Sequence, residues 1–273
     1  MNRRPKVAVA LYGLPRCSAV ATPSIETQII APLREWAEVR VYYHLFLQQR
    51  IDNPRSGEFG ELDPANYDFV RNYEGRLESP PDVTNTPMYN ALQQRGDRYG
   101  DGGKSIRNLL LQLHSLAEVG ALAMSADPDV VVYARSDLQY HDPIEMDVIR
   151  YAFHHPKVCA LPGWQWWYGC NDRFAICGRA AAPLYAHRGM LLENYCRRTR
   201  QPLEAEELLM YALRCGRSSV VALPLRASRI RLGGRLQDET FTGRTLRYRG
   251  FLGLYWARLA YTMIPRTDSG IAP

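Results

Sequence analysis

The sequence predicts an α/β fold with a mostly parallel central sheet, on three observations. An apolar run at 6–12 (KVAVALY) leads through a loop and a helical pattern to a second apolar run at 38–46, which is how a βαβ unit begins. A third run, VVVYA at 130–134, follows a long amphipathic pattern. The 273 residues are 46% hydrophobic and 23% charged, a globular composition that excludes collagen-like and wholly disordered proteins.

The first helix is expected to begin near Thr22 and Pro23, because threonine is a good N-cap and proline fits the first helical turn. Ile25 and Ile29 then share one face. Pro32 should kink or shorten this helix, since proline has no backbone N–H to donate.

The stretch 48–103 differs from its surroundings because it is polar and rich in Asn, Asp, Pro and Gly, with short helical patches only near 64–72 and 87–95. Segments of this kind in a compact domain are usually functional or inserted. We therefore expect an insertion or loop region here, within a domain that covers 1–224.

The rest of that domain alternates helices and strands. Leucines repeat on one stripe over 104–124, which predicts a helix that leads to the strand at 130–134. The further expected elements are a helix at 143–153, strands at 157–161 and 173–177, helices near 179–198 and 203–215, and a strand at 219–224.

The segment 225–273 is expected to form a basic, aromatic C-terminal extension. It holds nine arginines against three acidic residues, and its helical pattern at 248–264 mixes aromatic side chains with Arg249 and Arg258. Such a helix suits an anionic membrane surface. A closing helix that packs on the core and leaves its arginines in solvent is the alternative, and the sequence leaves both open.

The charged residues and the cysteines indicate what kind of ligand the protein prefers and in which compartment it is expected. The formal net charge is +6, and only three of the 34 basic residues are lysines. Arginine suits phosphates, although codon usage could produce the same bias. Six cysteines without a C-x-x-C pair indicate reduced thiols in a cytoplasmic protein. The apolar run near the N-terminus is too short for a signal peptide or a membrane span.

Polar residues directly after two expected strands are the first site candidates, because open parallel sheets bind ligands beyond the carboxyl ends of their strands. Arg16 follows the first strand and could clamp a phosphate. Asp137 follows VVVYA and could coordinate a divalent cation that bridges a pyrophosphate. A helix or turn cap is the competing interpretation of Asp137.

Three further clusters could carry chemistry. Asn171 and Asp172 follow an aromatic segment, and rings beside planar hydrogen-bonding groups suit sugar recognition, although a turn between core aromatics has the same pattern. Glutamates at 204, 206 and 207 begin a helix, where they also complement the helix dipole. The loop RIRLGG at 229–234 could bind phosphate or be a solvated charge run. The histidines are scattered apart from one adjacent pair, so no histidine-rich metal site is expected.

In their order along the chain these segments resemble bacterial, and some viral, glycosyltransferase-like proteins of the GT-A fold that assemble lipopolysaccharide, capsule and other surface glycans. The matching pieces cover about 7–234 and read VAVALYGLPR, NLLLQLHSLAEV, VVYARSDL, GCNDRFAIC, AEELLMYAL and RIRLGG. The resemblance implies a cytoplasmic glycosyltransferase, peripheral on the inner membrane face, that moves a sugar from a nucleoside-diphosphate donor of UDP type to a glycan or lipid-linked acceptor.

The resemblance also implies roles for individual residues. Glu206 would take the proton of the acceptor hydroxyl in an inverting displacement, with Asp172 as its rival. Asn171 and Asp172 would hold sugar hydroxyls. The residues implied to face the donor are Arg16, Asn108, Gln112, Ser115, Arg135, Asp137, Asn171, Arg229 and Arg231.

One departure from the family pattern concerns the metal. Typical members carry two aspartates at the strand end, whereas this chain has Arg135 and Asp137. Either Asp137 alone anchors Mn²⁺ or Mg²⁺ together with the pyrophosphate, or Arg135 replaces the charge of the metal. We expect the metal.

Two other functions stay open. A non-catalytic sugar- or nucleotide-binding protein of the same fold would explain the incomplete acidic pattern. An arginine-rich nucleic-acid-binding protein would explain the basic charge, but the chain has no recognised reader motif, so no nucleic-acid partner is expected.

Overall fold

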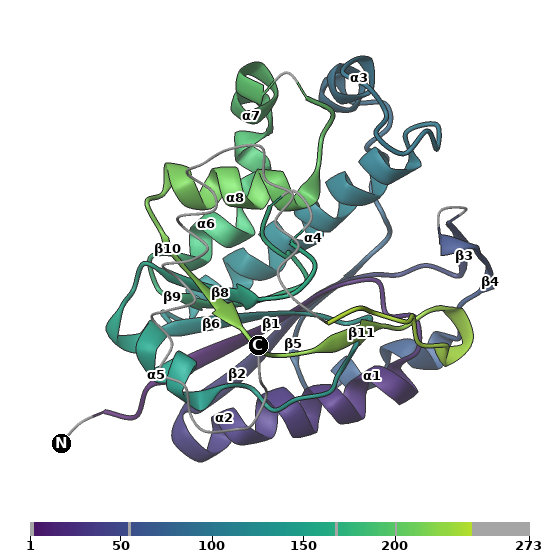
Figure 1. Ribbon diagram of the computed structural model, residues 1–273. Coiled ribbons are helices and arrows are strands. Elements are labelled where there is room, and N and C mark those ends of the chain that lie inside the picture. Colours follow the sequence, from purple (N-terminus) through teal and green to yellow (C-terminus); the bar gives the residue numbers. More distant parts are fainter. Residues whose placement is uncertain (1–2, 54–55, 167–168, 200, 242–273) are drawn as a thin grey trace.

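A computed structural model describes residues 3–53, 56–166, 169–199 and 201–241. Seven strands form one sheet in the order β10-β8-β9-β6-β1-β2-β5, with helices on both faces (Figure 1). Within this sheet β9 runs antiparallel to β6 and β8, and the other pairs are parallel. The predicted α/β class, with a mostly parallel central sheet flanked by helices, is therefore confirmed.

The strands of this sheet are β1 (Lys6–Gly13), β2 (Glu38–Phe46), β5 (Glu74–Glu78), β6 (Val130–Arg135), β8 (Val158–Pro162), β9 (Phe174–Gly178) and β10 (Ser219–Leu223). Two small antiparallel ribbons pair β3 (Arg50–Asn53) with β4 (Glu58–Glu61), and β7 (Leu138–Tyr140) with β11 (Ala227–Arg229). The helices, including short 3-10 and π segments marked η, are α1 (Ser18–Ser24), η1 (Ile25–Ile30), α2 (Ala31–Trp36), η3 (Pro64–Val70), α3 (Pro87–Gln94), α4 (Lys104–Ser125), α5 (Met146–His154), α6 (Ala182–Ala186), η4 (Arg188–Leu191), α7 (Leu192–Thr199), α8 (Ala205–Cys215) and η5 (Leu232–Gly234).

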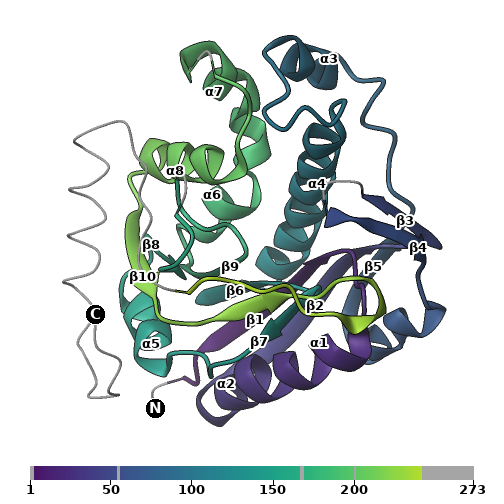
Figure 2. The same cartoon turned by 45° about the vertical axis from the view of Figure 1, so that its right-hand side comes forward.

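Two apolar layers hold the helices against the sheet. Successive side chains of β1 point to opposite faces, so that Val9 and Leu11 pack toward α1, η1, α2 and α5, whereas Ala10 and Tyr12 pack toward α4, α6 and α8 (Figure 2). A third apolar cluster joins α3 and α7 to α4 and α8. Because both faces are covered, the central strands are apolar throughout, as the runs in the sequence predicted.

The strand order changes direction between β1 and β6. The chain passes from β1 to β2 and β5 on one side, and then returns through α4 to β6 on the other side of β1. In open α/β sheets ligands bind at such a switch point, outside the carboxyl ends of the strands. The loop after β1 and the end of β6 both lie there.

Two expectations for the first half need correction. The polar stretch 48–103 contributes the edge strand β5, which pairs in parallel with β2, and its sequence EGRLE gave no strand signal because the strand is largely exposed. The first helix begins at Ser18 and contains Pro23. Packing explains the earlier start, since Ala21 is buried together with Ile25 and extends the apolar face by one turn.

Residues 225–241 pack on the domain. Within this range β11 pairs with β7, Ile230 is buried in the core, and the indole of Trp164 donates to the carbonyl of Leu225 over 2.8 Å. The expected helix at 248–264 lies outside the described residues, so its contact with a membrane surface stays a prediction. In the part of the chain that the structure describes, no helix combines the length and the apolar character needed to cross a bilayer.

Candidate functional site

A cavity of about 1230 Å³ opens at the carboxyl ends of β1 and β6. Its walls come from the loop after β1, the N-terminal half of α4, the end of β6, the start of α8 and the segment 229–240. The predicted site residues that line it are Arg16, Asn108, Gln112, Arg135, Asp137, Asp172, Glu206, Arg229 and Arg231. The fold therefore joins most of the residues that the sequence singled out.

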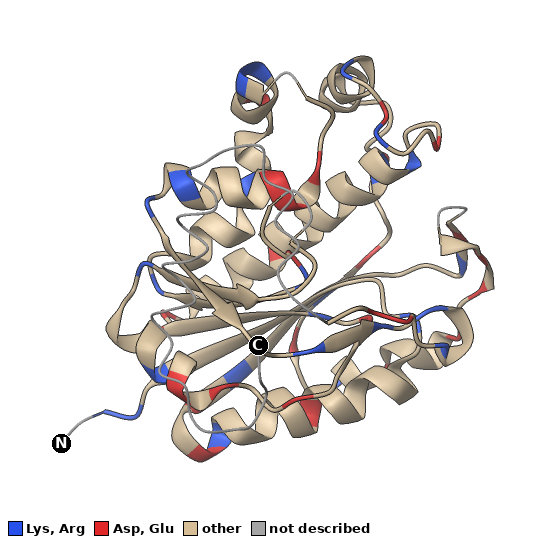
Figure 3. Cartoon of the chain, viewed as in Figure 1, with Lys and Arg blue, Asp and Glu red and all other residues tan. Residues whose placement is uncertain are grey.

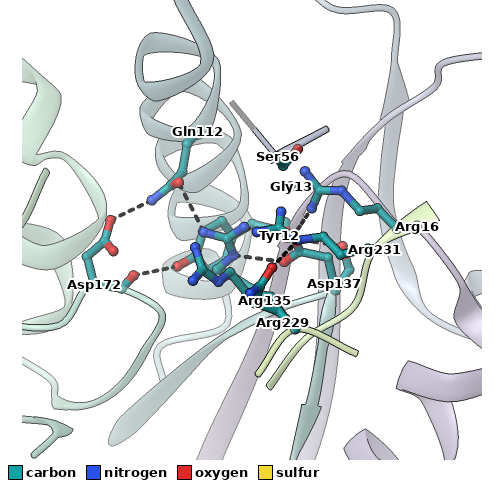
Figure 4. A network of polar contacts seen from close by, with 12 residues as sticks. Tyr12, Gly13, Arg16, Ser56, Gln112, Arg135, Asp137, Asp172, Arg229 and Arg231 are labelled. Atoms are coloured by element: carbon teal, nitrogen blue, oxygen red, sulfur yellow. Dashed lines mark hydrogen bonds and ion pairs between the residues drawn. The ribbon is translucent and has the colours of Figure 1, made fainter. Parts of the chain in front are cut away.

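Asp137 lies at the centre of an arginine network (Figure 4). Arg135 donates to its two carboxylate oxygens through Nε at 2.8 Å and Nη2 at 2.7 Å, and Arg16 contacts it through Nη1. The Asp137 side chain is 3% exposed. Burial raises the pKa of its carboxyl, but the charges of Arg135 and Arg16 lower it further, so that the pKa lies well below its usual range.

This arrangement fits an anion better than a divalent cation. Both oxygens of Asp137 already accept hydrogen bonds from guanidinium groups, and a cation beside them would face the charges of Arg16 and Arg135. Manganese or magnesium would need carboxylate oxygens that are not committed to arginine. The role of Asp137 as a metal ligand therefore stays a prediction, and its observed role is to hold two arginines in place.

Glu58 on β4 holds a second part of the network. Its carboxylate lies 3.2 Å from Nε of Arg16, accepts from Nη1 of Arg231 at 3.1 Å, and accepts from the backbone N–H of Leu232 at 2.9 Å. Burial and then the charge of Arg229 lower the pKa of Arg231. Through these contacts Glu58 links the polar 48–103 region to the arginines of the cavity wall.

Glu239 holds the third part. It accepts from Nε of Arg229 at 2.6 Å and from Nε2 of Gln165 at 2.8 Å, and it lies 3.5 Å from Nη1 of Arg173. Burial and then the charge of Arg229 lower the pKa of Arg173 to about 10. The lowered pKa of Arg173 reflects mainly its burial and, after that, the neighbouring charge of Arg229.

The arginine network carries an excess of positive charge. It consists of five arginines around three carboxylates, namely Arg16, Arg135, Arg173, Arg229 and Arg231 around Glu58, Asp137 and Glu239. The two uncompensated charges match a doubly ionised diphosphate, and planar guanidinium forks match its oxygens. The strand ends therefore carry a net positive charge that suits an anion.

Gln112 on α4 joins this network to Asp172. Its Oε1 accepts from Nη1 of Arg135 at 3.3 Å, and its Nε2 donates to Oδ2 of Asp172 at 2.7 Å (Figure 4). The fully buried Arg188 lies 3.4 Å from the same oxygen. The hydroxyl of Tyr12 donates to the backbone carbonyl of Asp172 over 3.1 Å. These contacts fix the Asp172 carboxylate at the cavity wall.

Glu206 lies in the first turn of α8, which begins after Glu204. Burial, followed by a hydrogen bond to Glu204 and the charge of Asp172, raises the pKa of Glu206 well above its ordinary value. Glu204 itself accepts from the hydroxyl of Tyr99 at 2.9 Å and lies 3.1 Å from Nε of Arg98. A raised pKa makes the ionised carboxylate a stronger base, which suits the transfer of a proton from a substrate hydroxyl.

Gly169 allows the loop before β9 to approach α8. A Cβ atom at this position would lie 2.1 Å from the backbone carbonyl oxygen of Glu206. Only glycine permits this contact, which brings the loop of Asp172 against the helix start that carries Glu206.

Two predicted site residues lie behind the cavity wall in the described structure. Ser115 donates from its hydroxyl to the carbonyl of His44 and accepts from the N–H of Gly13. The amide of Asn171 donates to the carbonyl of Trp164 and accepts from the N–H of Arg173. Both side chains support backbone that borders the cavity, and their direct contact with a donor stays a prediction.

Sequence reasoning missed Glu58, Arg173 and Glu239. Glu58 lies in a region without periodicity, and Arg173 was passed over beside Asn171 and Asp172. A signal for Glu239 does exist, because the basic loop 229–234 needs acidic partners once it is buried, and Asp238 and Glu239 are the nearest acids that follow it.

No family model matches the chain, and no curated protein matches it.

Proposed function

We propose that the protein is a glycosyltransferase that moves a sugar from a nucleoside-diphosphate donor, of UDP type, to a glycan or lipid-linked acceptor in surface polysaccharide assembly. The observation that carries the proposal is the meeting of the arginine network with Asp172 and Glu206 in one cavity at the switch point of the sheet. The strand order, with β9 antiparallel inside an otherwise parallel sheet, is compatible with a GT-A-like fold.

The arginine network would bind the diphosphate and stabilise the charge that develops on it as the sugar leaves. Arg16 and Arg135 are already oriented by Asp137, so little reorganisation is needed when the anion binds. Arg229 and Arg231 lie on the segment 229–240 of the cavity wall and would close around the phosphates. In this proposal arginines supply the positive charge, and dependence on Mn²⁺ or Mg²⁺ is tested separately.

The transfer step would use the other wall of the cavity. The acceptor hydroxyl oxygen attacks the anomeric carbon of the donor while its proton passes to Glu206, and the bond from that carbon to the diphosphate oxygen breaks. The nucleoside diphosphate leaves with the bonding electron pair. Asp172, held by Gln112 and Arg188, would orient sugar hydroxyls, so the sugar would lie between the arginine network and α8.

The distribution of charge supports a ligand inside the cavity rather than along an outer face. In Figure 3 basic and acidic residues are interspersed over the described chain. A nucleic-acid-binding surface needs basic residues gathered on one face or helix. The crowded arginines that the ion pairs define lie instead at the cavity.

The proposal is tested by measuring unfolding temperature with UDP, GDP, CDP and dTDP, each in EDTA and with Mn²⁺. A nucleotide at about 100 times its Kd adds roughly 2.7 kcal/mol and raises Tm by about 5–10 °C. We expect one nucleoside diphosphate to do so in EDTA and the matching nucleoside to have no effect. Stabilisation that requires Mn²⁺ would favour Asp137 as a metal ligand instead.

Two variants and an activity assay complete the test. Arg229→Gln should weaken the identified nucleotide by about 10–100-fold, because it removes charge-assisted contacts to the phosphates. Arg226→Gln is the matched control, since Arg226 pairs with Asp142 at the surface. The absence of stabilisation by any nucleotide contradicts the proposal. Binding of the donor without release of nucleoside diphosphate would identify a non-catalytic binding protein.

A further inference from the structure

His44, Glu78 and His114 form a cluster that is separate from the arginine network. His44 lies on β2, Glu78 ends β5, and His114 lies on α4, which packs on β2 (Figure 1). Oε2 of Glu78 is 2.7 Å from Nε2 of His44 and 2.9 Å from Nε2 of His114. One ligand atom from each residue lies within 4.8 Å of the other two.

The hydrogen bonds of Ser115 determine which nitrogen of His44 carries hydrogen. The Ser115 hydroxyl donates to the His44 backbone carbonyl at 2.7 Å, so its single proton is used. Its oxygen accepts from the N–H of Gly13 at 3.0 Å and lies 3.1 Å from Nδ1 of His44. Nδ1 must therefore be the donor, and in a neutral imidazole Nε2 is then a bare lone pair.

That lone pair faces a carboxylate oxygen. Nε2 of His44 and Oε2 of Glu78 are both acceptors at 2.7 Å, and the His44 side chain is fully buried, so water cannot relieve their repulsion. The contact requires either a proton between the two atoms or a metal ion that both atoms bind after they move apart. Nε2 of His114 adds a third convergent ligand atom, which a shared proton does not need.

We propose that Nε2 of His44, Nε2 of His114 and Oε2 of Glu78 bind a divalent transition-metal ion of the zinc class. Two imidazoles and a carboxylate are a donor set that zinc uses with an open fourth position. Tetrahedral zinc would place the ligand atoms about 3.3 Å apart, so the two contacts of Glu78 have to lengthen by roughly half an ångström. The other oxygen of Glu78 lies 3.9 Å from Arg76, which favours binding through Oε2 alone.

The surroundings match those of a metal site. A metal-bound histidine usually donates its other ring nitrogen to a fixed acceptor, as Nδ1 of His44 does to Ser115. The His114 side chain is 34% exposed, which provides access for the ion and for a water ligand. Through Ser115 the cluster also reaches Gly13, at the start of the loop that carries Arg16, so a bound ion would stiffen one wall of the cavity.

The test uses tag-free protein that has been stripped with a chelator and then titrated with Zn²⁺ in the absence of nucleotide. We expect one equivalent of zinc per chain, and we expect Co²⁺ to give the visible absorption bands of a tetrahedral site. His114→Gln should weaken Zn²⁺ binding by at least about 100-fold, and Ser115→Ala by about 10–100-fold. His154→Gln is the matched control, because His154 is exposed at the end of α5 and lies outside the cluster.

The following outcomes distinguish a bound metal ion from a proton shared by His44 and Glu78. Failure of the parent protein to bind Zn²⁺ or Co²⁺ would overturn the proposal, and that measurement does not depend on any variant folding. Equal zinc binding by the parent and His114→Gln, with native circular dichroism, would also overturn it. Since no nucleotide is present, neither result bears on the glycosyltransferase proposal.

Discussion

Replacing Asp137 by Asn should destabilise the folded protein strongly. The Asp137 carboxylate is buried and accepts from two nitrogens of Arg135 and one of Arg16. An asparagine keeps one acceptor oxygen but turns an NH₂ group toward the guanidinium groups. The substitution therefore leaves Arg135 without its counter-ion and Arg16 with Glu58 alone.

The size of the effect follows from this burial. Removing one partner of a buried ion pair costs about 3–5 kcal/mol, because the remaining charge is not solvated. For a domain of this size each kcal/mol shifts Tm by roughly 2–4 °C, which gives a loss of about 6–20 °C. The matched control is Asp142→Asn, since Asp142 also binds an arginine through two nitrogens, but its side chain is 27% exposed and that of Arg226 is 46% exposed. A half-exposed pair contributes about 0–1 kcal/mol, so the control should lose at most about 4 °C.

Both variants are compared with the parent by thermal unfolding, followed by circular dichroism between pH 3 and pH 7. The pKa of Asp137 is lowered in the folded state, so its stabilisation is complete above the unfolded pKa of about 3.9 and is lost as the pH falls through the folded value. The deficit of Asp137→Asn should therefore be full at pH 7 and begin to shrink below about pH 4. Equal Tm losses for Asp137→Asn and Asp142→Asn at pH 7 would refute the counter-ion role.

The remaining predictions concern the other wall of the cavity. Glu206→Gln should reduce donor turnover, measured by release of nucleoside diphosphate, by about 10²–10⁴-fold and leave nucleotide affinity within a few-fold. Turnover within a few-fold of the parent would reject Glu206 as the base, and Asp172→Asn would then be examined. Because the folded pKa of Glu206 is raised, the parent loses stability as the pH rises above the unfolded pKa of about 4.3 toward the folded value, since the unfolded chain ionises first. Glu206→Gln should therefore melt above the parent at pH 8 and level with it near pH 4. A constant difference would contradict the raised pKa. Gly169→Ala should lower the free energy of unfolding by about 1–3 kcal/mol, seen as a lower Tm, because its Cβ would meet the Glu206 carbonyl. At Gly57 a Cβ would meet nothing within 4 Å, so Gly57→Ala should be destabilised less, by its positive φ alone.

Much of the fold could be predicted from local sequence patterns. The strand at 38–46 has the predicted limits, and the helix expected at 104–124 extends by one residue to Ser125. These elements are buried, so hydrophobic periodicity reports them directly. The edge strand β5 escaped detection because its residues are largely exposed and carry no apolar pattern.

The candidate site could be predicted in part for a related reason. Arg16 and Asp137 were singled out because each follows an apolar strand, and parallel strands bring their carboxyl ends to one edge. The rule places residues at an edge but does not say which of them pair. The structure shows that Asp137 pairs with Arg16 and Arg135, whereas its expected role as a metal ligand stays a prediction.

The sequence by itself determined the order of the buried elements and the strand ends at which polar residues gather. Only the tertiary structure decided the partners: Glu58 with Arg16 and Arg231, Glu239 with Arg229, and the meeting of His44, Glu78 and His114. The physical reason is the distance along the chain over which each interaction acts. Periodicity and capping act over a few residues, whereas Arg16 and Asp137 are 121 positions apart and meet only because the sheet places β1 beside β6.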